Sequence, residues 1–499
     1  MADGDLVESL ERTMKEAPST HCIEIKEMEA GDQVESLTSR MKEAHCNQWR
    51  QEPCSIFRVP FKLRWSHIDA YDQNLIYRGP YDPFYVSIGP YHRGKPQLRP
   101  MEEFKLRALQ HLLSRNPTIT LARCLEEMKG LELRARSCYS EAINMLSEEF
   151  VEMMLLDGCF TVFILTCELD DLVWMPGEGL HGIEHSVDGG GIAPTVALKE
   201  NVMYDLLLLE NQIPYFVLKA LFNLLITGLS NENISLEQLA IECLSDIYPA
   251  RTNPSVSGDQ VQHLLHLLYL SIIPVIEPQK SDAPSKKLLL CDLLSIFIRK
   301  QKFPSSSGGP NNSNFSWIPS MTEMKEAGVR FKVKNSTSLL DVTFCNGVIE
   351  IPTLVLDDTT KSMLHNLVAY EQCYRYTKDH VTCYTVFMDC LVNTPADVSI
   401  LQDEKIMKND LGSENEAAQF INQLGIEVRY DWNESYLFNL FNEVNRFCGS
   451  RRNKWRAKLV HDYFSNPWAI ISLGAAVVLL ILTFLQTFFA MYTYFHPSS

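Results

Sequence analysis

The sequence predicts a mainly α-helical protein: a large helical cytosolic body, a small antiparallel β-hairpin element and one C-terminal transmembrane helix. Apolar residues recur at helical spacing through most of the chain. Residues 329–356 instead alternate around the turn dipeptide Asn346-Gly347, which favours a hairpin. Residues 468–491 contain no charged side chain. We therefore expect three regions: an acidic extension over 1–53, a mostly helical body over 54–465, and a membrane helix over 468–491.

Composition limits the function classes. The chain has 499 residues, 46% hydrophobic and 21% charged, which is ample apolar material for one or two folded domains. Its formal net charge of −17 argues against a general nucleic-acid binder, because phosphate neutralisation needs excess Lys and Arg. The 14 cysteines include no C-x-x-C pair, so we expect free thiols in a reducing cytosol.

The acidic extension contains a duplication. Residues 4–17, GDLVESLERTMKEA, return at 31–44 as GDQVESLTSRMKEA. Apolar residues fall at i, i+3 and i+7 in each copy, which predicts a thin apolar stripe on a charged helix. Two interpretations stay open: a mobile tail, or a pair of helices that dock into a groove of an unknown protein partner. The candidate partner-binding residues are Leu10, Met14, Leu37 and Met41.

The body opens near Cys54, and a predicted strand at 84–88 leads into a loop at 89–96. The loop sequence, GPYHRGKP, matches the G-x-x-x-x-G-K pattern of a phosphate-binding loop. Pro96 replaces the Ser or Thr that would hold Mg²⁺. Pro90 and Pro96 also each lack the backbone N–H group that such a loop uses to bind phosphate. We therefore expect a turn rich in Gly and Pro, and no cofactor.

Helical patterns occupy most of the remaining body. Pro100, followed by two glutamates, predicts a helix start. The run 150–167 is long and apolar but contains charged residues, so we expect a buried core helix rather than a second membrane span. We interpret 202–229 in the same way, with Pro214 ending or kinking its helix.

Other segments interrupt the helical pattern. Residues 278–287 and 304–316 are rich in Pro, Ser, Gly and Asn, which predicts exposed loops. A small antiparallel sheet is expected between 329 and 356, after which helices resume from Lys361.

No motif identifies a catalytic centre: the chain has no G-x-S-x-G, H-E-x-x-H, G-x-G-x-x-G or kinase-type pattern. His263 and His266 lie one helical turn apart, as metal ligands can, but no third ligand has motif spacing nearby, so no metal is expected. Two function classes remain: a membrane-tethered recognition or scaffold protein, and a membrane-anchored enzyme of unrecognised class. The enzyme would depend on polar residues of the body, such as His92, Asp157 or Glu210.

The C-terminal run predicts a membrane anchor. At about 1.5 Å per residue, 468–491 is roughly 36 Å long, enough to cross a hydrocarbon core of about 30 Å. Basic residues precede it and none follow it, so we expect a single-pass, tail-anchored protein whose body is cytosolic, at the plasma membrane or an endomembrane. The predicted anchor residues are Trp468, Leu479, Leu480, Phe484 and Phe488. The basic residues expected to set topology and to meet anionic lipid are Arg451, Arg452, Lys454, Arg456 and Lys458.

Several blocks of the body carry a family resemblance. They are VSIGPYHRG (86–94), MEEFK (101–105), MMLLDGCF (153–160), DLLLLENQIPYFVL (205–218), the stretch 319–331, NGVIEIPTL (346–354), NLVAYEQ (366–372) and YFSNPWAIIS (463–472). Together they resemble the plant domain-of-unknown-function 247 family, also called uncharacterised protein family 0481, from about residue 54 onward. The resemblance implies a plant protein with a mostly helical soluble region and a C-terminal transmembrane helix. Some family members are implicated in pollen self-incompatibility in grasses. The family brings no catalytic residues with it.

Overall fold

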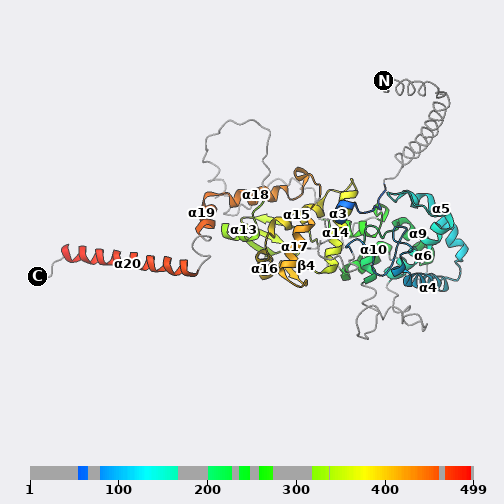
Figure 1. The fold of residues 1–499 in the computed structure, drawn as a ribbon, viewed down its shortest axis with the longest axis horizontal. Coiled ribbons are helices and arrows are strands. Elements are labelled where there is room, and N and C mark those ends of the chain that lie inside the picture. The colour runs from blue at the N-terminus through cyan, green and yellow to red at the C-terminus, as the bar shows by residue number, and fades with distance from the viewer. Residues whose placement is uncertain are drawn as a thin grey trace, which may run out of the picture. The chain divides into compact units, whose positions relative to one another are not determined.

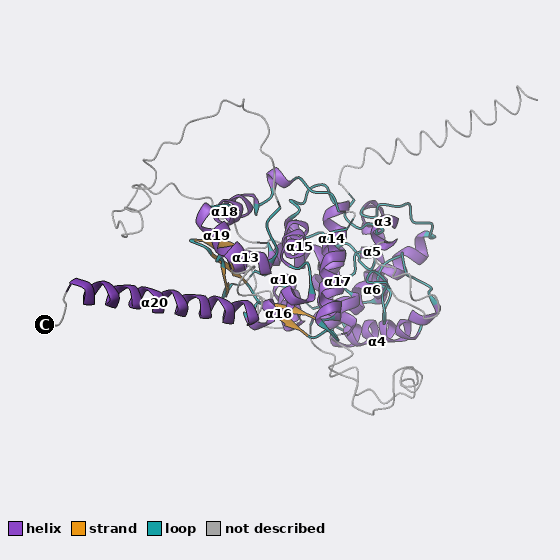
Figure 2. Cartoon of the chain, turned by 60° about the vertical axis from the view of Figure 1, so that its left-hand side comes forward, coloured by secondary structure: helices purple, strands orange, loops and turns teal. Residues whose placement is uncertain are grey.

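Helices make up most of the structure, a computed structural model in which the strands are short (Figure 2). The described residues are 54–65, 79–166, 201–226, 235–247, 258–273, 317–336, 338–426, 428–459 and 467–495. The chain divides into two units, Met1–Cys54 and Ser55–Ser499, and the elements described below belong to the second. The duplicated segments at 4–17 and 31–44, predicted to be helices, and the loops predicted at 278–287 and 304–316 lie outside the described residues.

The first group of helices contains α6, which lies among α4, α5 and α9 (Figure 1). Its members are α3 (Phe61–Trp65), α4 (Pro100–Arg115), α5 (Leu121–Ser137), α6 (Ser147–Leu165), α9 (Tyr215–Leu225), α10 (Leu236–Ile247) and α11 (Leu264–Ile272), with short 3₁₀ turns at Pro96–Leu98 and Gly258–Gln260. α6 packs against α4, α5, α9 and α10. Apart from Glu152, its residues from Phe150 to Leu165 are buried, which confirms the predicted core helix. The start of α4 at Pro100 is confirmed as well.

The helix predicted over 202–229 is interrupted earlier than expected. Helical structure ends at Asp205, and Pro214 directly precedes α9 rather than kinking a continuous helix. The side chains of Asn211 and Gln212 explain the break, because they donate to backbone carbonyls in the intervening turn. Asn211 Nδ2 donates to Asp205 O at 2.8 Å, and Gln212 Nε2 donates to Leu206 O at 2.6 Å. These side chains satisfy acceptors that a longer helix would otherwise satisfy.

The predicted hairpin is present but belongs to a mixed sheet. β2 (Thr343–Cys345) and β3 (Val348–Ile351) pair antiparallel, and Asn346 and Gly347 between them have φ of +50° and +77°. Positive φ at both positions is what a tight hairpin turn requires. β1 (Arg330–Val333) lies on the other side of β3 and runs parallel to it, giving the order β1-β3-β2. A second, two-stranded parallel sheet pairs β4 (Leu354–Leu356) with β5 (Met407–Asn409).

The second group of helices packs with these sheets. Its members are α13 (Met321–Ala327), α14 (Asp358–Cys373), α15 (His380–Leu391), α16 (Pro395–Asp403), α17 (Glu414–Leu424), α18 (Phe438–Cys448) and α19 (Arg451–Leu459), with a 3₁₀ turn at Trp432–Glu434. α14 begins three residues before the predicted Lys361, because the Asp357 side chain caps it by accepting from Thr360 N–H at 2.7 Å. Buried apolar residues of both groups form one continuous core.

The residues predicted to form the membrane helix lie in α20 (Pro467–Phe495), a continuous helix of 29 residues. Among the described residues, no helix was found that is both long enough and apolar enough to cross a membrane.

Candidate functional site

The prediction of a strand at 84–88 is wrong: residues 84–89, here called the 84–89 segment, bend at Phe84 and Tyr85, and their backbone N–H groups bind side chains instead of a neighbouring strand. Asp205 accepts hydrogen bonds from the first three of these backbone N–H groups, including that of Phe84 at 2.7 Å. Asn211 Oδ1 accepts from the N–H of Ile88 at 2.7 Å. Buried backbone donors must find acceptors, and here a carboxylate and a carboxamide supply them.

Beneath this segment, Asp157 of α6 and Lys105 of α4 form a buried ion pair. Lys105 Nζ lies 2.6 Å from Asp157 Oδ1, and both residues are 0% exposed. Asp157 also accepts from the N–H of Gly89 at 2.8 Å, while Lys105 donates to Ser87 O and to Glu102 Oε1, each at 2.6 Å. Burial raises the pKa of Asp157, and the ammonium of Lys105 opposes that rise. The pair therefore ties two helices to the 84–89 segment.

A second network surrounds Glu210. Arg64 bridges two carboxylates, with Nη2 2.7 Å from Glu210 and Nη1 3.2 Å from Asp82. His92 lies between the same carboxylates, with Nε2 3.5 Å from Glu210 and Nδ1 4.0 Å from Asp82. Burial, reinforced by the positive charge of Lys95, lowers the pKa of His92 to about 3, so its ring is neutral near pH 7. Lys95, the lysine of the phosphate-loop-like sequence, is itself paired with Asp82 at 3.0 Å.

These networks contain the three residues on which an enzyme would depend. An imidazole close to carboxylates is a common arrangement for general acid–base catalysis. However, His92, Asp157 and Glu210 are 2%, 0% and 1% exposed. The two carboxylates bind basic side chains and backbone N–H groups of the body, whereas neither ring nitrogen of His92 has a hydrogen-bond partner among the described residues. The geometry of Asp157 and Glu210 therefore best fits a role in holding separate segments of the body together.

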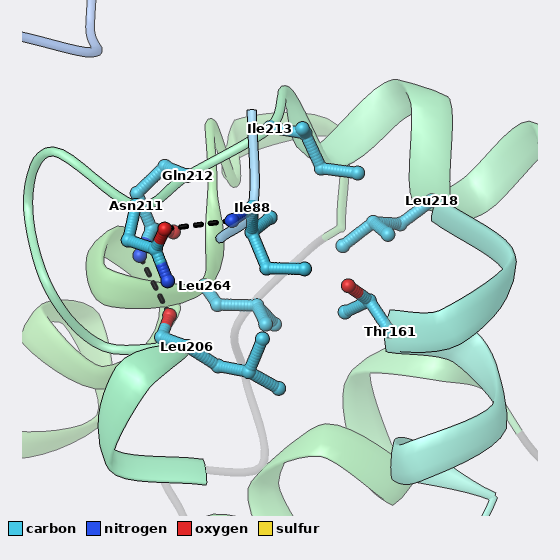
Figure 3. Close-up of a pocket in the computed structure, with 8 residues that line it drawn as sticks. All are labelled: Ile88, Thr161, Leu206, Asn211, Gln212, Ile213, Leu218 and Leu264. Atoms are coloured by element: carbon cyan, nitrogen blue, oxygen red, sulfur yellow. Dashed lines mark hydrogen bonds between the residues drawn. The ribbon is translucent and has the colours of Figure 1, made fainter. Parts of the chain in front are cut away.

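A small hollow lies beside the networks, between the 84–89 segment, α6, the 206–214 turn, α9 and α11 (Figure 3). It is lined by Ile88, Thr161, Leu206, Asn211, Gln212, Ile213, Leu218 and Leu264. The two amide side chains among these make the hydrogen bonds drawn in Figure 3, from Ile88 to Asn211 and from Gln212 to Leu206. The space is too narrow for a water molecule, and it therefore offers no room for a small-molecule substrate.

α14 supplies further buried polar side chains that the sequence analysis did not single out. Asn366 Oδ1 accepts from Leu209 N–H, and its Nδ2 donates to Pro80 O, both at 2.8 Å. Glu371 accepts from two backbone N–H groups at the start of α15, at 2.9 and 2.7 Å. Burial raises the pKa of Glu371 to about 7. The sequence contains one signal that could have identified Asn366 and Glu371: both are polar residues within the largely apolar block NLVAYEQ.

His263 caps a helix that contains His266. His263 Nδ1 accepts from His266 N–H at 3.2 Å at the start of α11, and His263 Nε2 lies 3.0 Å from Ser55 O. Burial lowers the pKa of His266 to about 4. Within the described part of the chain, no group of three or more His, Cys, Asp or Glu side chains could hold a metal ion.

The remaining predicted residues lie on exposed helices or outside the description. Arg451, Arg452, Lys454, Arg456 and Lys458 are all exposed on α19. Leu479, Leu480, Phe484 and Phe488 are exposed on α20; Trp468 belongs to the same helix, but its side chain lies outside the description. Leu10, Met14, Leu37 and Met41 lie outside the described residues.

Comparisons with known proteins give one consistent result. A family model described as a plant protein of unknown function, DUF247, matches residues 56–482. The UPF0481 protein At3g47200 of Arabidopsis thaliana is 30% identical over 457 residues, covering 89% of this chain and 87% of that protein. The putative UPF0481 protein At3g02645 of the same plant is 25% identical over 508 residues, covering 88% and 91%. No solved structure matches significantly.

Proposed function

The chain belongs to DUF247, a plant protein family of unknown function, and on that premise we propose that it is a membrane-anchored recognition or scaffold protein that acts by binding another protein. One observation carries the choice of recognition over catalysis. The polar residues that an enzyme would use, His92, Asp157 and Glu210, are buried, and the two carboxylates among them are paired with basic side chains of the body. Side chains whose hydrogen bonds and ion pairs hold the fold together are not free to bind and release a substrate.

The proposed anchor is α20. Its support is the absence of charge over 468–491, the continuous helix, and side chains such as Leu480 and Phe484, which are 70% and 72% exposed. Leu and Phe each favour membrane insertion by about 0.3–0.6 kcal/mol. The basic residues of α19 precede the helix, which favours a cytosolic body at the plasma membrane or an endomembrane.

The anchor can be tested by adding charge to it. Replacing Leu480 and Phe484 by Arg should oppose insertion by roughly 2.5–3.5 kcal/mol per site, whereas Leu480→Val with Phe484→Leu should leave it intact. Alkaline carbonate extraction from plant membranes would separate the outcomes: the wild type and the conservative variant stay in the pellet, and the Arg variant moves to the supernatant. Pelleting of the Arg variant would contradict an anchor in α20.

Topology needs a separate measurement. A glycosylation acceptor appended after Ser499 should be modified, because the end of α20 is proposed to lie across the membrane from the body. The N-x-Ser/Thr sequences at Asn233 and Asn433 should stay unmodified. Glycans on either of them, together with an unmodified tail, would reverse the proposed topology.

We propose the duplicated stripe of the extension as one binding element. Two weak helices joined by a short linker bind a divalent partner much more tightly than one helix does, if the linker spans both sites. Leu10→Asp combined with Leu37→Asp should therefore reduce proximity labelling of partners far more than either change alone. Ser9→Asp with Ser36→Asp is the matched control, because it adds the same charge beside the stripe.

The labelling experiment also decides where recognition resides. A set of labelled partners that is unchanged by the leucine changes would exclude the extension and leave recognition to the surface of the body. If the protein were an enzyme, its activity would instead be unchanged by substitutions in the extension and altered by substitutions in the body.

A further inference from the structure

The exposed face of α19 combines large apolar side chains with basic ones. α19 packs against α13 and α18, with Asn453 and Ala457 half-buried on its inner side. Asn453 Nδ2 donates to Phe447 O at 2.8 Å, which fixes the rotation of the helix. Trp455 and Leu459, one turn apart, therefore point outward and are 80% and 49% exposed.

Cations flank this apolar pair. Arg451, Arg452, Lys454 and Lys458 are exposed around Trp455, and no acidic residue occurs between Arg446 and Val460. A tryptophan left four-fifths exposed is unusual on a surface that meets only water. Tryptophan and cationic side chains together are typical of surfaces at the boundary between water and lipid headgroups.

We propose that the outer face of α19 (Arg451, Arg452, Lys454, Trp455, Lys458 and Leu459) lies on an anionic bilayer, with the Trp455 ring among the headgroups. This inference rests on the proposed anchoring by α20. Eight peptide units join Leu459 to Pro467, and even fully extended they span about 28 Å. If α20 enters the bilayer, α19 therefore stays within that distance of its surface.

The basic residues of α19 favour binding to anionic rather than neutral lipids. Cytosolic leaflets carry phosphatidylserine and phosphoinositides, and each nearby basic residue gains about 1 kcal/mol, or roughly a fivefold factor in binding. The rest of the chain is acidic, with a formal net charge of −17 overall, so it would be repelled by the same surface. Attraction at α19 and repulsion elsewhere would fix which side of the body faces the membrane.

The test uses the full chain in nanodiscs of phosphatidylcholine alone and of phosphatidylcholine mixed with phosphatidylserine. Hydrogen–deuterium exchange of peptides covering 451–459 should slow by roughly tenfold when phosphatidylserine is present, and high salt should remove the difference. Brominated phosphatidylcholine should quench the fluorescence of Trp455, which is isolated as the difference between the wild type and Trp455→Phe.

Charge reversal supplies the matched control. Arg452→Glu with Lys458→Glu should abolish the effect of phosphatidylserine on exchange. Arg375→Glu with Lys378→Glu should retain it, although this pair likewise flanks an exposed aromatic side chain, Tyr376, at 60%.

The possible results distinguish the lipid contact of α19 from the proposed anchoring by α20. A chain that does not stay in nanodiscs at all would refute anchoring by α20. A chain that stays, but whose 451–459 exchange is the same in both lipid compositions or whose Trp455 is not quenched, would refute the lipid contact alone. Equal effects of the two charge reversals would show a non-specific effect of net charge and would also refute it.

Discussion

Asp205→Asn is the most direct test of how the 84–89 segment is held in place. The Asp205 carboxylate is 4% exposed and accepts three backbone N–H groups, from residues 84–86. An asparagine has the same shape, but its NH₂ group would face at least one of these donors, so one or two of the three hydrogen bonds are lost. A hydrogen bond to a charged group contributes about 1.5–3 kcal/mol. The free energy of unfolding should therefore fall by about 2–5 kcal/mol.

Urea unfolding of the full chain in detergent micelles would measure this loss. Hydrogen exchange should also speed up at residues 84–86, because their N–H groups lose protection. Glu103→Gln is the matched control: that carboxylate is 65% exposed and pairs with Arg107 on the surface of α4, so its loss should change stability by less than about 0.5 kcal/mol. A loss below about 1 kcal/mol for Asp205→Asn, with unchanged exchange, would refute the role assigned to this side chain.

Three further predictions follow from the buried groups and the hairpin. Lys105→Met should cost about 3–5 kcal/mol by leaving Asp157 buried without its cation. Adding Asp157→Leu should recover part of this loss in urea unfolding, because it removes the buried charge but also the acceptor of the Gly89 N–H; a double variant no more stable than the single would contradict this. Burial raises the pKa of Glu371 from its usual 4.5 to about 7, so its stabilisation is complete below pH 4.5 and is lost as pH rises through 7. The stability of the wild type minus that of Glu371→Gln should fall by up to about 3 kcal/mol from pH 4.5 to 8, and a constant difference would exclude the raised pKa. Gly347→Ala should cost about 1–3 kcal/mol in thermal unfolding, because φ is +77° and a ring carbon of Phe447 lies 2.6 Å from the added Cβ; an unchanged midpoint would contradict this.

Features governed by local rules could be predicted from the sequence. Pro100 followed by acidic residues predicted the start of α4, and the apolar run 150–167 predicted the core helix α6. Asn346-Gly347 predicted the hairpin because positive φ at two successive positions suits few residue types. In each case the determining residues lie within a few positions of the structure that they specify.

Features that depend on distant partners could not be predicted. The run 84–88 has the composition of a strand, but its acceptors are side chains more than 100 residues away, such as Asp205, 121 positions after Phe84. The pairing of β1 with β3 in parallel likewise depends on tertiary packing, since no local signal specifies it. For the candidate site, the sequence identified His92, Asp157 and Glu210 as polar residues of interest, but their burial depends on the whole fold.

The interlocking side chains have a consequence for synthesis of the chain. Pro80 O accepts from Asn366, 286 positions later, and Leu209 N–H donates to the same asparagine, 157 positions before it. At roughly 5–20 residues per second, a ribosome synthesises Asn366 about 15–60 s after it has synthesised Pro80. During that interval Pro80 O lacks the donors that α14 gives it in the folded chain, and closing so long a loop carries an entropic cost that slows folding. We therefore expect the early part of the body to depend on chaperones until α14 has emerged from the ribosome.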